Sequence, residues 1–517
     1  MIADAGTLAG VIGEVASARP EAPAIIDDLG TVTFCELADR IEATAGLVEE
    51  LLPALPVAVI GPNHRTWVEA YYGIPASGRV LVFLNHRLHA RELLTMIQRS
   101  GAGLVMGDQQ EIRRLVDGGL DLPVFDWGTW SGLVDGVESR AARARATSAR
   151  PTSADTAWLL FTSGTTAAPK GAMLSNANIL AAVESSSRAR PVEPDDVYLF
   201  PFPLCHVAGY NVVHRHVHGR PVVLMPGFAA AQFCDIVERE SVTSTSLAAT
   251  MLAALVDLLE AEPVRRKQLR SLRSVAYGAA PMPTSLLRRA DELLGVDFAQ
   301  GYGMTELSGN AVFLDAATHR RGLAGETQLL EAAGRPAPGV ELRIADDDGN
   351  GLPDGEMGEI LVRAEQVMSG YLDDEAATSA AIVDGWLHTG DVGHVVDGLL
   401  TVVDRKKDMV ITGGENVSSL EVEAAILEHP DVARVAVVGV ADPTWGENVC
   451  AIVVPRSGSM IDVTDLVVHV RSRLAGFKVP RHVVIMDELP VNTSGKVMKA
   501  DLRARLAQEP DLIGERL

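Results

Sequence analysis

The stretch LLFTSGTTAAPKG, residues 159–171, is the most informative segment of the chain. An apolar strand runs into four hydroxyl side chains around one glycine, and a lysine follows. Backbone N–H groups and hydroxyls can hold phosphate oxygens while the ammonium neutralises them. The segment is not a Walker loop, because Lys170 is followed by Gly171 instead of Ser or Thr. Taken alone, it is more typical of a surface loop rich in turn-forming residues.

Short apolar runs alternate with helix-like stretches on both sides of this segment. Val57–Ile60 is followed by Thr66–Ala76 and Val80–Phe83, and the pattern resumes with Trp158–Phe161 and Asn176–Ser186. This rhythm predicts βα units around a mainly parallel sheet.

The spacing of turn-forming residues changes towards the C-terminus. After about Glu331, glycine and proline punctuate short strands, as in a β-rich subdomain. From Asp404 onward, a compact series of elements includes an apparent strand at Ala433–Val440 and an apparent helix at Val463–Leu474. We therefore predict an α/β fold. A large N-terminal domain, 1–403, has βα subdomains and a β-rich subdomain, and a small α+β C-terminal domain, 404–517, follows.

The composition excludes several classes of protein. The 517 residues include 45 Lys and Arg against 68 Asp and Glu, a net charge of −23, which disfavours binding to nucleic acid or anionic membranes. The 4 cysteines form no Cys-x-x-Cys pair, which argues against a disulfide scaffold or a cysteine-rich zinc site. No signal peptide and no apolar run of about 18 residues is found. We expect no transmembrane segment and a cytoplasmic location.

Five further segments form a recognisable set of motifs together with residues 159–171. In chain order they are Gly301–Glu306, Thr389–Asp391, Asp404–Asp408, Gly413–Asn416 and Asn492–Lys496. With them the chain resembles the adenylate-forming superfamily, which includes acyl-CoA synthetases, peptide-synthetase adenylation domains and firefly-type luciferases. The resemblance spans residues 20–505, and we assign it to the branch of fatty and aryl acid–CoA ligases.

The resemblance implies a reaction in two steps, with ATP, Mg²⁺ and coenzyme A. A carboxylate attacks the α-phosphate of ATP to give an acyl-adenylate and pyrophosphate, and a thiol then displaces AMP to give a thioester. The first step builds negative charge on phosphate oxygens, so we expect catalysis by positioning and charge neutralisation. The implied phosphate-binding residues of the first segment are Thr162, Ser163, Gly164, Thr165, Thr166 and Lys170.

The Gly301–Glu306 segment is expected to contact the nucleotide and the metal. Glu306 is the candidate Mg²⁺ ligand, since this ion needs only one or two carboxylates besides phosphates and water. Thr305 can hydrogen-bond the α-phosphate, and the ring of Tyr302 can stack on adenine. The glycines allow backbone to approach a ligand closely. The other expected contacts of the adenine slot are Gly278, Ala279, Ala280, Gly301, Gly303 and Met304.

Later motifs imply a ribose site and a mobile C-terminal domain. Asp391 can accept hydrogen bonds from both ribose hydroxyls, and Arg405 can donate to the same ribose. In the family, the lysine that matches Lys496 reaches the carboxylate and the α-phosphate during adenylation. The family hinge corresponds to Asp404. Rotation there would withdraw the lysine and bring Gly413, Gly414 and Glu415 against the adenylate, which would admit the thiol.

His206 matches the family's histidine between the adenylate site and the acyl tunnel, so we expect it to gate or position the acyl group. The segment Cys205–Asn211 contains no aspartate to hold an α-amine, which disfavours amino acids. Small and apolar residues around it, such as Ala208 and Val212, indicate a fatty, alicyclic or aryl acid.

Only 21 residues follow Lys496, too few for a fused carrier domain, so free CoA is the expected acceptor. Three alternatives stay open from sequence: a separate carrier protein as acceptor, a luciferase-like oxidoreductase, and a non-catalytic adenylate-binding relative. The last is disfavoured because Lys496, Glu306, Asp391 and Arg405 are all retained. A homodimeric assembly also stays open.

The run His214–His218 is unusual, because three histidines alternate with other residues. Helical geometry would turn residues i and i+2 apart, which argues against a metal site. We interpret the run as a polar patch that faces solvent or a lid.

Overall fold

The computed structural model describes residues 6–136, 151–162, 169–278, 282–413, 415–492, 496–509 and 512. The chain divides into two compact units. The first unit comprises residues 1–342 and 362–387, and the second comprises 343–361 and 388–517. The chain changes unit inside three strands: β16 (Glu341–Ala345), β17 (Gly358–Arg363) and β20 (Trp386–Val396). The predicted boundary at Asp404 stays a prediction.

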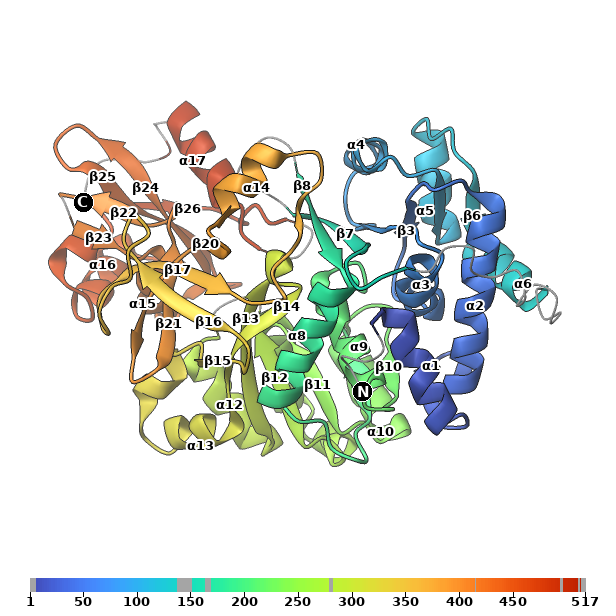
Figure 1. Cartoon of the computed structure of the whole chain (residues 1–517). Helices are drawn as coiled ribbons and strands as arrows, with labels where there is room; N and C mark the ends of the chain where they lie inside the picture. Colours follow the sequence, from blue (N-terminus) through green and yellow to red (C-terminus); the bar gives the residue numbers. More distant parts are fainter. Residues whose placement is uncertain are drawn as a thin grey trace. The chain divides into compact units, whose positions relative to one another are not determined.

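The first unit contains a seven-stranded sheet in the order β18-β8-β7-β4-β3-β5-β6 (Figure 1). Its inner strands pair in parallel, and β8 and β18 add antiparallel pairs at one edge. The strands are β3 (Val57–Ile60), β4 (Leu81–Leu84), β5 (Leu104–Gly107), β6 (Val124–Asp126), β7 (Thr156–Thr162), β8 (Lys170–Ser175) and β18 (Gly370–Tyr371). Every residue of β3, β4 and β5 is buried, as in parallel strands covered on both faces.

A nine-stranded sheet follows in the same unit, in the order β15-β14-β13-β12-β11-β9-β10-β1-β2. Neighbouring strands pair in parallel along the central run β13-β12-β11-β9-β10-β1. At the two ends of the sheet, β2, β14 and β15 pair antiparallel. Their bounds are β1 (Pro23–Asp27), β2 (Gly30–Thr33), β9 (Tyr198–Phe200), β10 (Val222–Leu224), β11 (Ser244–Leu247), β12 (Ser274–Gly278), β13 (Asp297–Met304), β14 (Gly309–Leu314) and β15 (Arg335–Pro336). The sheet confirms the predicted βα rhythm.

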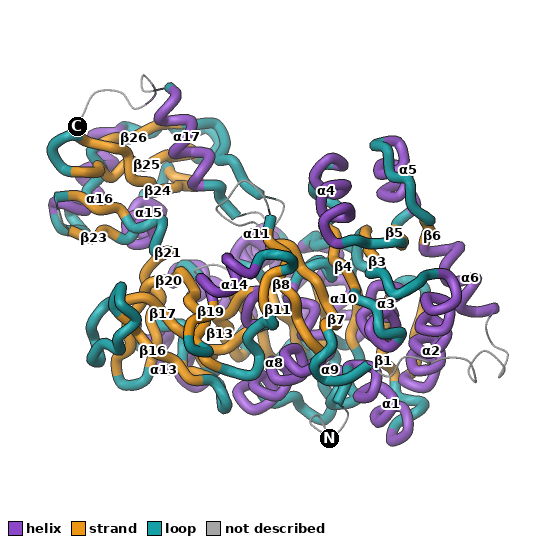
Figure 2. The backbone as a smooth tube through the Cα atoms, turned by 45° about the horizontal axis from the view of Figure 1, so that its top comes forward, coloured by secondary structure: helices purple, strands orange, loops and turns teal. Residues whose placement is uncertain are grey.

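Helices of the first unit cover these sheets, and helix α3 is buried along most of its length. The helices are α1 (Leu8–Ala18), α2 (Phe34–Leu51), α3 (Arg65–Ala76), α4 (Ala90–Ser100), α5 (Gln109–Asp117), α6 (Trp127–Gly136), α8 (Asn176–Ala189), α9 (Tyr210–His216), α10 (Ala230–Glu240), α11 (Ala249–Ala261), α12 (Thr284–Leu294), α13 (Ala316–Leu323) and α14 (Glu375–Ala381). Figure 2 shows how these helices alternate with the strands along the chain. No described helix combines the length and apolar content needed to cross a bilayer.

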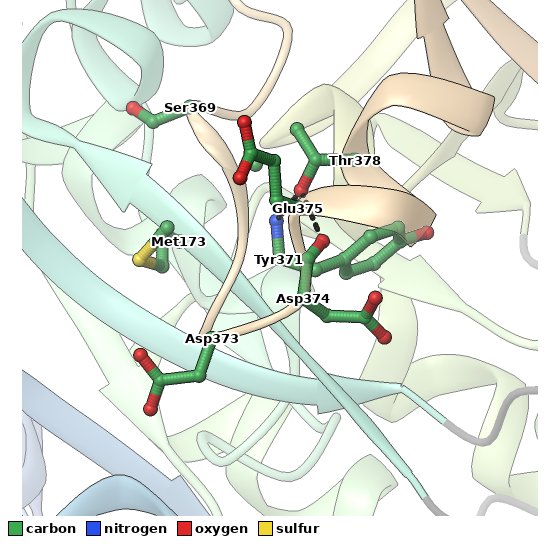
Figure 3. Close-up of a pocket in the computed structure, with 8 residues that line it drawn as sticks. Met173, Ser369, Tyr371, Asp373, Asp374, Glu375 and Thr378 are labelled. Carbon is green, nitrogen blue, oxygen red and sulfur yellow. Dashed lines mark hydrogen bonds between the residues drawn. The ribbon is translucent and has the colours of Figure 1, made fainter.

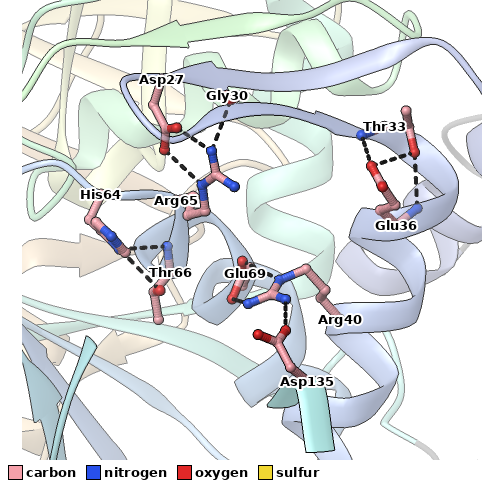
Figure 4. Close-up of polar contacts among 10 residues, drawn as sticks. All are labelled: Asp27, Gly30, Thr33, Glu36, Arg40, His64, Arg65, Thr66, Glu69 and Asp135. Carbon is pink, nitrogen blue, oxygen red and sulfur yellow. Dashed lines mark hydrogen bonds and ion pairs between the residues drawn. The ribbon is translucent and has the colours of Figure 1, made fainter. Parts of the chain in front are cut away.

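Polar contacts fix the start of this unit (Figure 4). Helix α2 begins with a capping box, in which Thr33 and Glu36 each bind the backbone N–H of the other. Glu69 is fully buried, so burial raises the pKa of its carboxyl group, and Arg40 opposes this shift by donating to Glu69 Oε1 at 2.7 Å. Arg65 donates from Nε to Asp27 Oδ2 at 2.9 Å. These contacts tie α2 to α3 and α3 to β1.

The predicted β-rich portion is present as a five-stranded sheet. Its order is β16-β17-β20-β19, with β21 paired to β20. The additional strands are β19 (Ile382–Val383) and β21 (Leu399–Arg405). β20 and β21 form an antiparallel pair that brings Asp391 opposite Arg405.

The last sheet of the second unit has the order β23-β22-β25-β24, with β26 paired to β25. The elements are β22 (Val410–Thr412), β23 (Glu415–Val417), α15 (Ser419–Leu427), β24 (Val432–Asp442), β25 (Gly446–Pro455), α16 (Val463–Arg471), β26 (His482–Ile485) and α17 (Lys499–Gln508). Alternate residues of β24 and β25 face opposite sides, with α15 and α16 packed on one face and α17 on the other. The predicted fold class is confirmed.

Candidate functional site

The two ends of the phosphate segment are held together in the first unit. β7 ends at Thr162 and β8 begins at Lys170, and these two residues are antiparallel partners. Thr162 Oγ1 also donates to the Lys170 carbonyl at 3.4 Å. Lys170 is therefore the first residue of a paired strand, and this pairing fixes its backbone. The predicted contacts Ser163, Gly164, Thr165 and Thr166 lie outside the described residues.

Glu306 lies in a short 3-10 turn, Thr305–Leu307, between β13 and β14. Its backbone carbonyl accepts from Met368 N at 2.8 Å, and its Oε1 accepts from the Tyr371 hydroxyl at 2.9 Å. The residues from Tyr302 to Glu306, including Met304, are partly exposed, so they can meet a ligand. The structure thus fixes both the backbone and the carboxylate of the candidate metal ligand.

Sequence reasoning missed Tyr371, which joins two of the predicted residues. Its hydroxyl donates to Glu306, and the Lys170 ammonium lies over its ring, 5.0 Å from the centroid. Burial, followed by the negative charge of Glu306, raises the pKa of the Tyr371 hydroxyl, so it stays protonated and donates. Nothing in the sequence around Gly370 and Tyr371 indicates this contact, because Glu306 is 65 residues away.

The glycines of the predicted adenine slot also have a packing role, which the sequence did not indicate. β12 and β13 place Gly278 opposite Gly301. A Cβ on Gly301 would lie 2.2 Å from Asn310 Nδ2, and one on Gly303 would lie 2.0 Å from the Gly309 carbonyl oxygen. Gly303 thus requires glycine for the close approach of the β14 backbone, whereas a side chain at Gly301 would have to displace the side chain of Asn310, whether or not a ligand is present. Ala279 and Ala280 lie outside the described residues.

The predicted ribose residues meet in the second unit. Arg405 Nε lies 2.6 Å from Asp391 Oδ1, and the carboxylate is buried. Asp391 N donates to Thr389 Oγ1 at 3.1 Å, and that hydroxyl donates to the Ile360 carbonyl at 2.7 Å. The Thr-Gly-Asp motif therefore orients its own aspartate. A carboxylate held in this way presents acceptor oxygens suited to a pair of hydroxyls.

Lys496 also belongs to the second unit. Its backbone exchanges hydrogen bonds with Asn492, from Lys496 N to Asn492 Oδ1 at 2.9 Å and from Asn492 N to the Lys496 carbonyl at 2.8 Å. The residue as a whole is exposed to solvent. The protein around its ammonium group nevertheless desolvates that group and lowers its pKa, and the positive charge of Arg405 lowers the pKa further. Asp391 opposes this shift. Lys496 therefore shares an electrostatic environment with the ribose pair.

The other predicted residues of the second unit lie in a hairpin. Gly413 directly follows β22 with a φ of 61°, and Glu415 begins β23 and is exposed. A Cβ on Gly413 would lie 2.7 Å from the ring of Trp445, so a glycine is required there. Gly414 lies outside the described residues.

His206 precedes a short 3-10 helix, Val207–Gly209, in the first unit. Burial lowers the pKa of its imidazole to about 4, with further contributions from Arg87 and His86. The ring is therefore neutral at pH 7. Its Nε2 is buried and has no hydrogen-bond partner among the described residues. A buried ring nitrogen without a partner is suited to meet a substrate group or water.

The interpretation of His214–His218 as a solvent- or lid-facing patch was wrong. His214 and His216 are fully buried on α9. His216 Nε2 donates to the Ala24 carbonyl at 3.0 Å, and its Nδ1 accepts from the Tyr72 hydroxyl at 2.8 Å. The run faces inward because α9 packs against α8 and α1, while the partners of His216 come from α3 and β1. No group of three His, Cys, Asp or Glu in the described ranges could hold a metal.

The residues fit a magnesium ion bound chiefly through a nucleotide. Glu306 provides hard oxygen donors, and the Tyr371 hydrogen bond occupies only one of its oxygens. Mg²⁺ prefers such oxygens and usually binds through one or two carboxylates plus phosphates and water. A cage made of protein ligands alone is not required, so the single carboxylate is an adequate anchor.

Comparisons with known proteins agree with this arrangement. Residues 12–372 match a family model described as AMP-binding enzyme, and residues 421–496 match the AMP-binding enzyme C-terminal domain. The feruloyl-CoA synthase of an Amycolatopsis species is 35% identical over 495 residues, which cover 94% of this chain and 96% of that one.

Two further relatives cover nearly the whole chain. The 3-[(3aS,4S,7aS)-7a-methyl-1,5-dioxo-octahydro-1H-inden-4-yl]propanoyl:CoA ligase of Rhodococcus jostii is 37% identical over 514 residues, covering 93% of this chain and 95% of that one. The solved o-succinylbenzoate coenzyme A synthetase of Bacillus subtilis, in complex with ATP and a magnesium ion, is 30% identical. Its TM-score is 0.83, and the match covers 96% of this chain and 99% of that one.

Proposed function

This chain belongs to the AMP-binding enzymes and is an AMP-forming acid–CoA ligase, and from that premise we propose its substrates and the roles of its residues. It activates an apolar carboxylic acid (fatty, alicyclic or aryl) with ATP and Mg²⁺ to an acyl-adenylate. It then transfers the acyl group to CoA, with release of AMP. The predicted membership of the adenylate-forming superfamily is confirmed.

The contact of Lys170 and Glu306 with one tyrosine is the observation that best supports the first step. A cation for phosphate oxygens and a carboxylate for Mg²⁺ are thereby brought to the same edge of the first unit. When bound, Mg²⁺ would neutralise phosphate charge as pyrophosphate leaves. Lys170 would orient the phosphates, and Thr305 would hydrogen-bond the α-phosphate.

Residues of the second unit would complete the step. Asp391 would accept hydrogen bonds from the ribose, and Arg405 would hold that carboxylate in place. Lys496 would stabilise charge at the α-phosphate and the attacking carboxylate. We further propose that Asp404 is the hinge of a mobile domain, 404–517, which withdraws Lys496 and brings Gly413 and Glu415 to the adenylate.

The proposed acyl class rests on the surroundings of His206. This neutral ring is followed by Val207 and Ala208, which pack against the apolar core. Asn211 in the same segment is already engaged, since its Oδ1 accepts from Arg190 at 2.7 Å and its Nδ2 donates to the Ala208 carbonyl at 3.0 Å. The segment Cys205–Asn211 contains no acidic residue that could hold an amine. An aryl or alicyclic acid also agrees with the substrates named for two relatives.

The test is pyrophosphate release with Mg·ATP over a panel of fatty, alicyclic, aryl and amino acids, each with and without CoA. We expect release with an apolar acid and a thioester that requires CoA. Lys496→Ala should lose adenylation, while Lys267→Ala, an exposed lysine of the first unit, should retain it. A Lys496→Ala variant with normal adenylation would contradict the proposed role.

Other outcomes would identify the alternatives. Pyrophosphate release without a CoA thioester would indicate a carrier protein as acceptor. Uptake of O₂ coupled to adenylate consumption would indicate a luciferase-like oxidoreductase. The homodimer stays a prediction, which light scattering of the purified chain would test.

A further inference from the structure

Tyr371 contacts two groups of opposite charge through different parts of its side chain. Its hydroxyl donates to Glu306 Oε1 at 2.9 Å, and the Lys170 ammonium lies 5.0 Å from its ring centroid. Within the described ranges, the Glu306 carboxylate and the Lys170 ammonium each contact Tyr371 and form no ion pair with each other. The tyrosine is thus a shared neutral partner.

A neutral partner has a specific advantage at this position. A lysine and a glutamate that contact the same tyrosine attract each other, and a direct ion pair between them would have to be broken before ATP and Mg²⁺ could bind. A ring face attracts the ammonium only weakly when the site is open to water. The hydroxyl occupies one carboxylate oxygen of Glu306 and leaves the other available.

The backbone of Tyr371 is anchored independently of these two contacts. β18 pairs with β8, with Tyr371 opposite Ala172, and Leu372 N donates to the Gly171 carbonyl at 2.8 Å. Tyr371 N donates to Thr378 Oγ1 at 2.9 Å. Both residues line an open pocket of about 500 Å³. Figure 3 shows the ring of Tyr371 turned away from Met173 and Asp373. An anchored backbone lets the ring hold a defined place.

We propose that Tyr371 is a positioning residue for the first half-reaction, which keeps Glu306 and Lys170 from pairing with each other and orients both for Mg·ATP. The inference rests on the proposed function, because Glu306 acts there as the metal ligand. The hydroxyl fixes the rotamer of Glu306, so little side-chain freedom is lost when the metal binds. The ring keeps Lys170 near the phosphate segment without neutralising it.

Two substitutions separate the two contacts. Tyr371→Phe keeps the ring under Lys170 and removes the hydroxyl, whereas Tyr371→Leu removes both. ATP binding is measured by calorimetry, once with Mg²⁺ and once with EDTA. We expect Tyr371→Phe to weaken binding about tenfold with Mg²⁺ and to leave binding in EDTA unchanged. Tyr371→Leu should weaken binding in both conditions, by a further factor of about three in each.

A matched control and a double variant test the assignment. Tyr72→Phe removes another buried tyrosine hydroxyl that is bonded to His216, and it should leave ATP binding unchanged. In a Glu306→Gln background, Tyr371→Phe should have no further effect on the Mg²⁺ dependence. Equal loss with Mg²⁺ and with EDTA for Tyr371→Phe, or unchanged binding in both, would overturn the proposal.

These binding measurements do not require turnover. A chain that releases no pyrophosphate with any acid would contradict the proposed function, while the Mg²⁺-specific loss in Tyr371→Phe would still support the role of the tyrosine. Normal turnover combined with a wild-type Mg²⁺ requirement in Tyr371→Phe would leave the function intact and overturn the positioning role.

Discussion

Arg405 Nε lies 2.6 Å from Asp391 Oδ1, and the two residues are direct partners across β20 and β21. The register of an antiparallel pair places both side chains on the same face of the sheet. Thirteen residues of chain lie between Asp391 and Arg405, which meet because the hairpin returns in register. The Asp391–Arg405 ion pair is therefore formed within one local hairpin.

Asp391→Asn should raise the KM for ATP about tenfold, because the amide keeps only one acceptor oxygen for the ribose hydroxyls. Arg405 is partly exposed, so loss of the ion pair should change the free energy of unfolding by no more than about 1 kcal/mol. Steady-state kinetics and denaturant titration measure the two effects. Glu341→Gln, which removes the exposed partner of Arg363, is the control and should leave the KM unchanged.

Gly303→Ala should destabilise the first unit by about 1–3 kcal/mol, because the new methyl group would meet the Gly309 backbone at 2.0 Å. The forced shift of β14 would also move Glu306, so pyrophosphate release should fall. Gly132→Ala is the matched control, since nothing lies within 4 Å of the added methyl group and the position is helical. There we expect a gain of about 0.5–1 kcal/mol. Equal stability of both variants would contradict the packing role.

The stability of the protein should fall in mild acid, in part through His216. Burial lowers the pKa of this histidine to about 4, below its ordinary value of about 6.5. The unfolded chain therefore binds a proton between these pH values and the folded chain does not, so stability is lost as the pH falls from 6.5 towards 4. One such group contributes a loss of about 2 kcal/mol between pH 7 and pH 5.

The measurement compares the pH dependence of unfolding for the wild type and His216→Gln. The variant loses stability at every pH, because it disturbs the contacts with Tyr72 and Ala24, but its slope between pH 7 and pH 5 should be shallower. An identical slope in both proteins would show that His216 does not contribute to the acid sensitivity.

Asp404→Ala should slow thioester formation more than adenylation. The Asp404 carboxylate accepts from Ser419 N at 2.6 Å and from Ser419 Oγ at 2.5 Å, so it ties the proposed hinge to the start of α15. Loss of these bonds would uncouple residue 404 from the helix that must turn with it. ATP–pyrophosphate exchange and CoA thioester formation are measured separately. Asp408→Ala, which removes the partner of Arg503, is the control for a general loss of stability.

Helices and strands that depend on a few consecutive residues could be predicted without the structure. The apolar run before Thr162 predicted a strand, and it is β7. The predicted helix at Thr66–Ala76 is α3, and the predicted strand at Ala433–Val440 lies within β24. Such signals are local, because the periodicity of buried residues and the turn formers around them are read directly along the chain. The order of the motifs, likewise, was sufficient to predict the family.

The contacts of Tyr371, the need for glycine at Gly303 and the inward orientation of His216 became visible only in the folded chain. Each depends on a partner that is distant in sequence, such as Glu306 for Tyr371 or Tyr72 for His216. The amino-acid type at one position does not indicate which distant residue it will contact. Packing between separate strands and helices selects that residue, and with it the pKa, the tautomer and the orientation of the group.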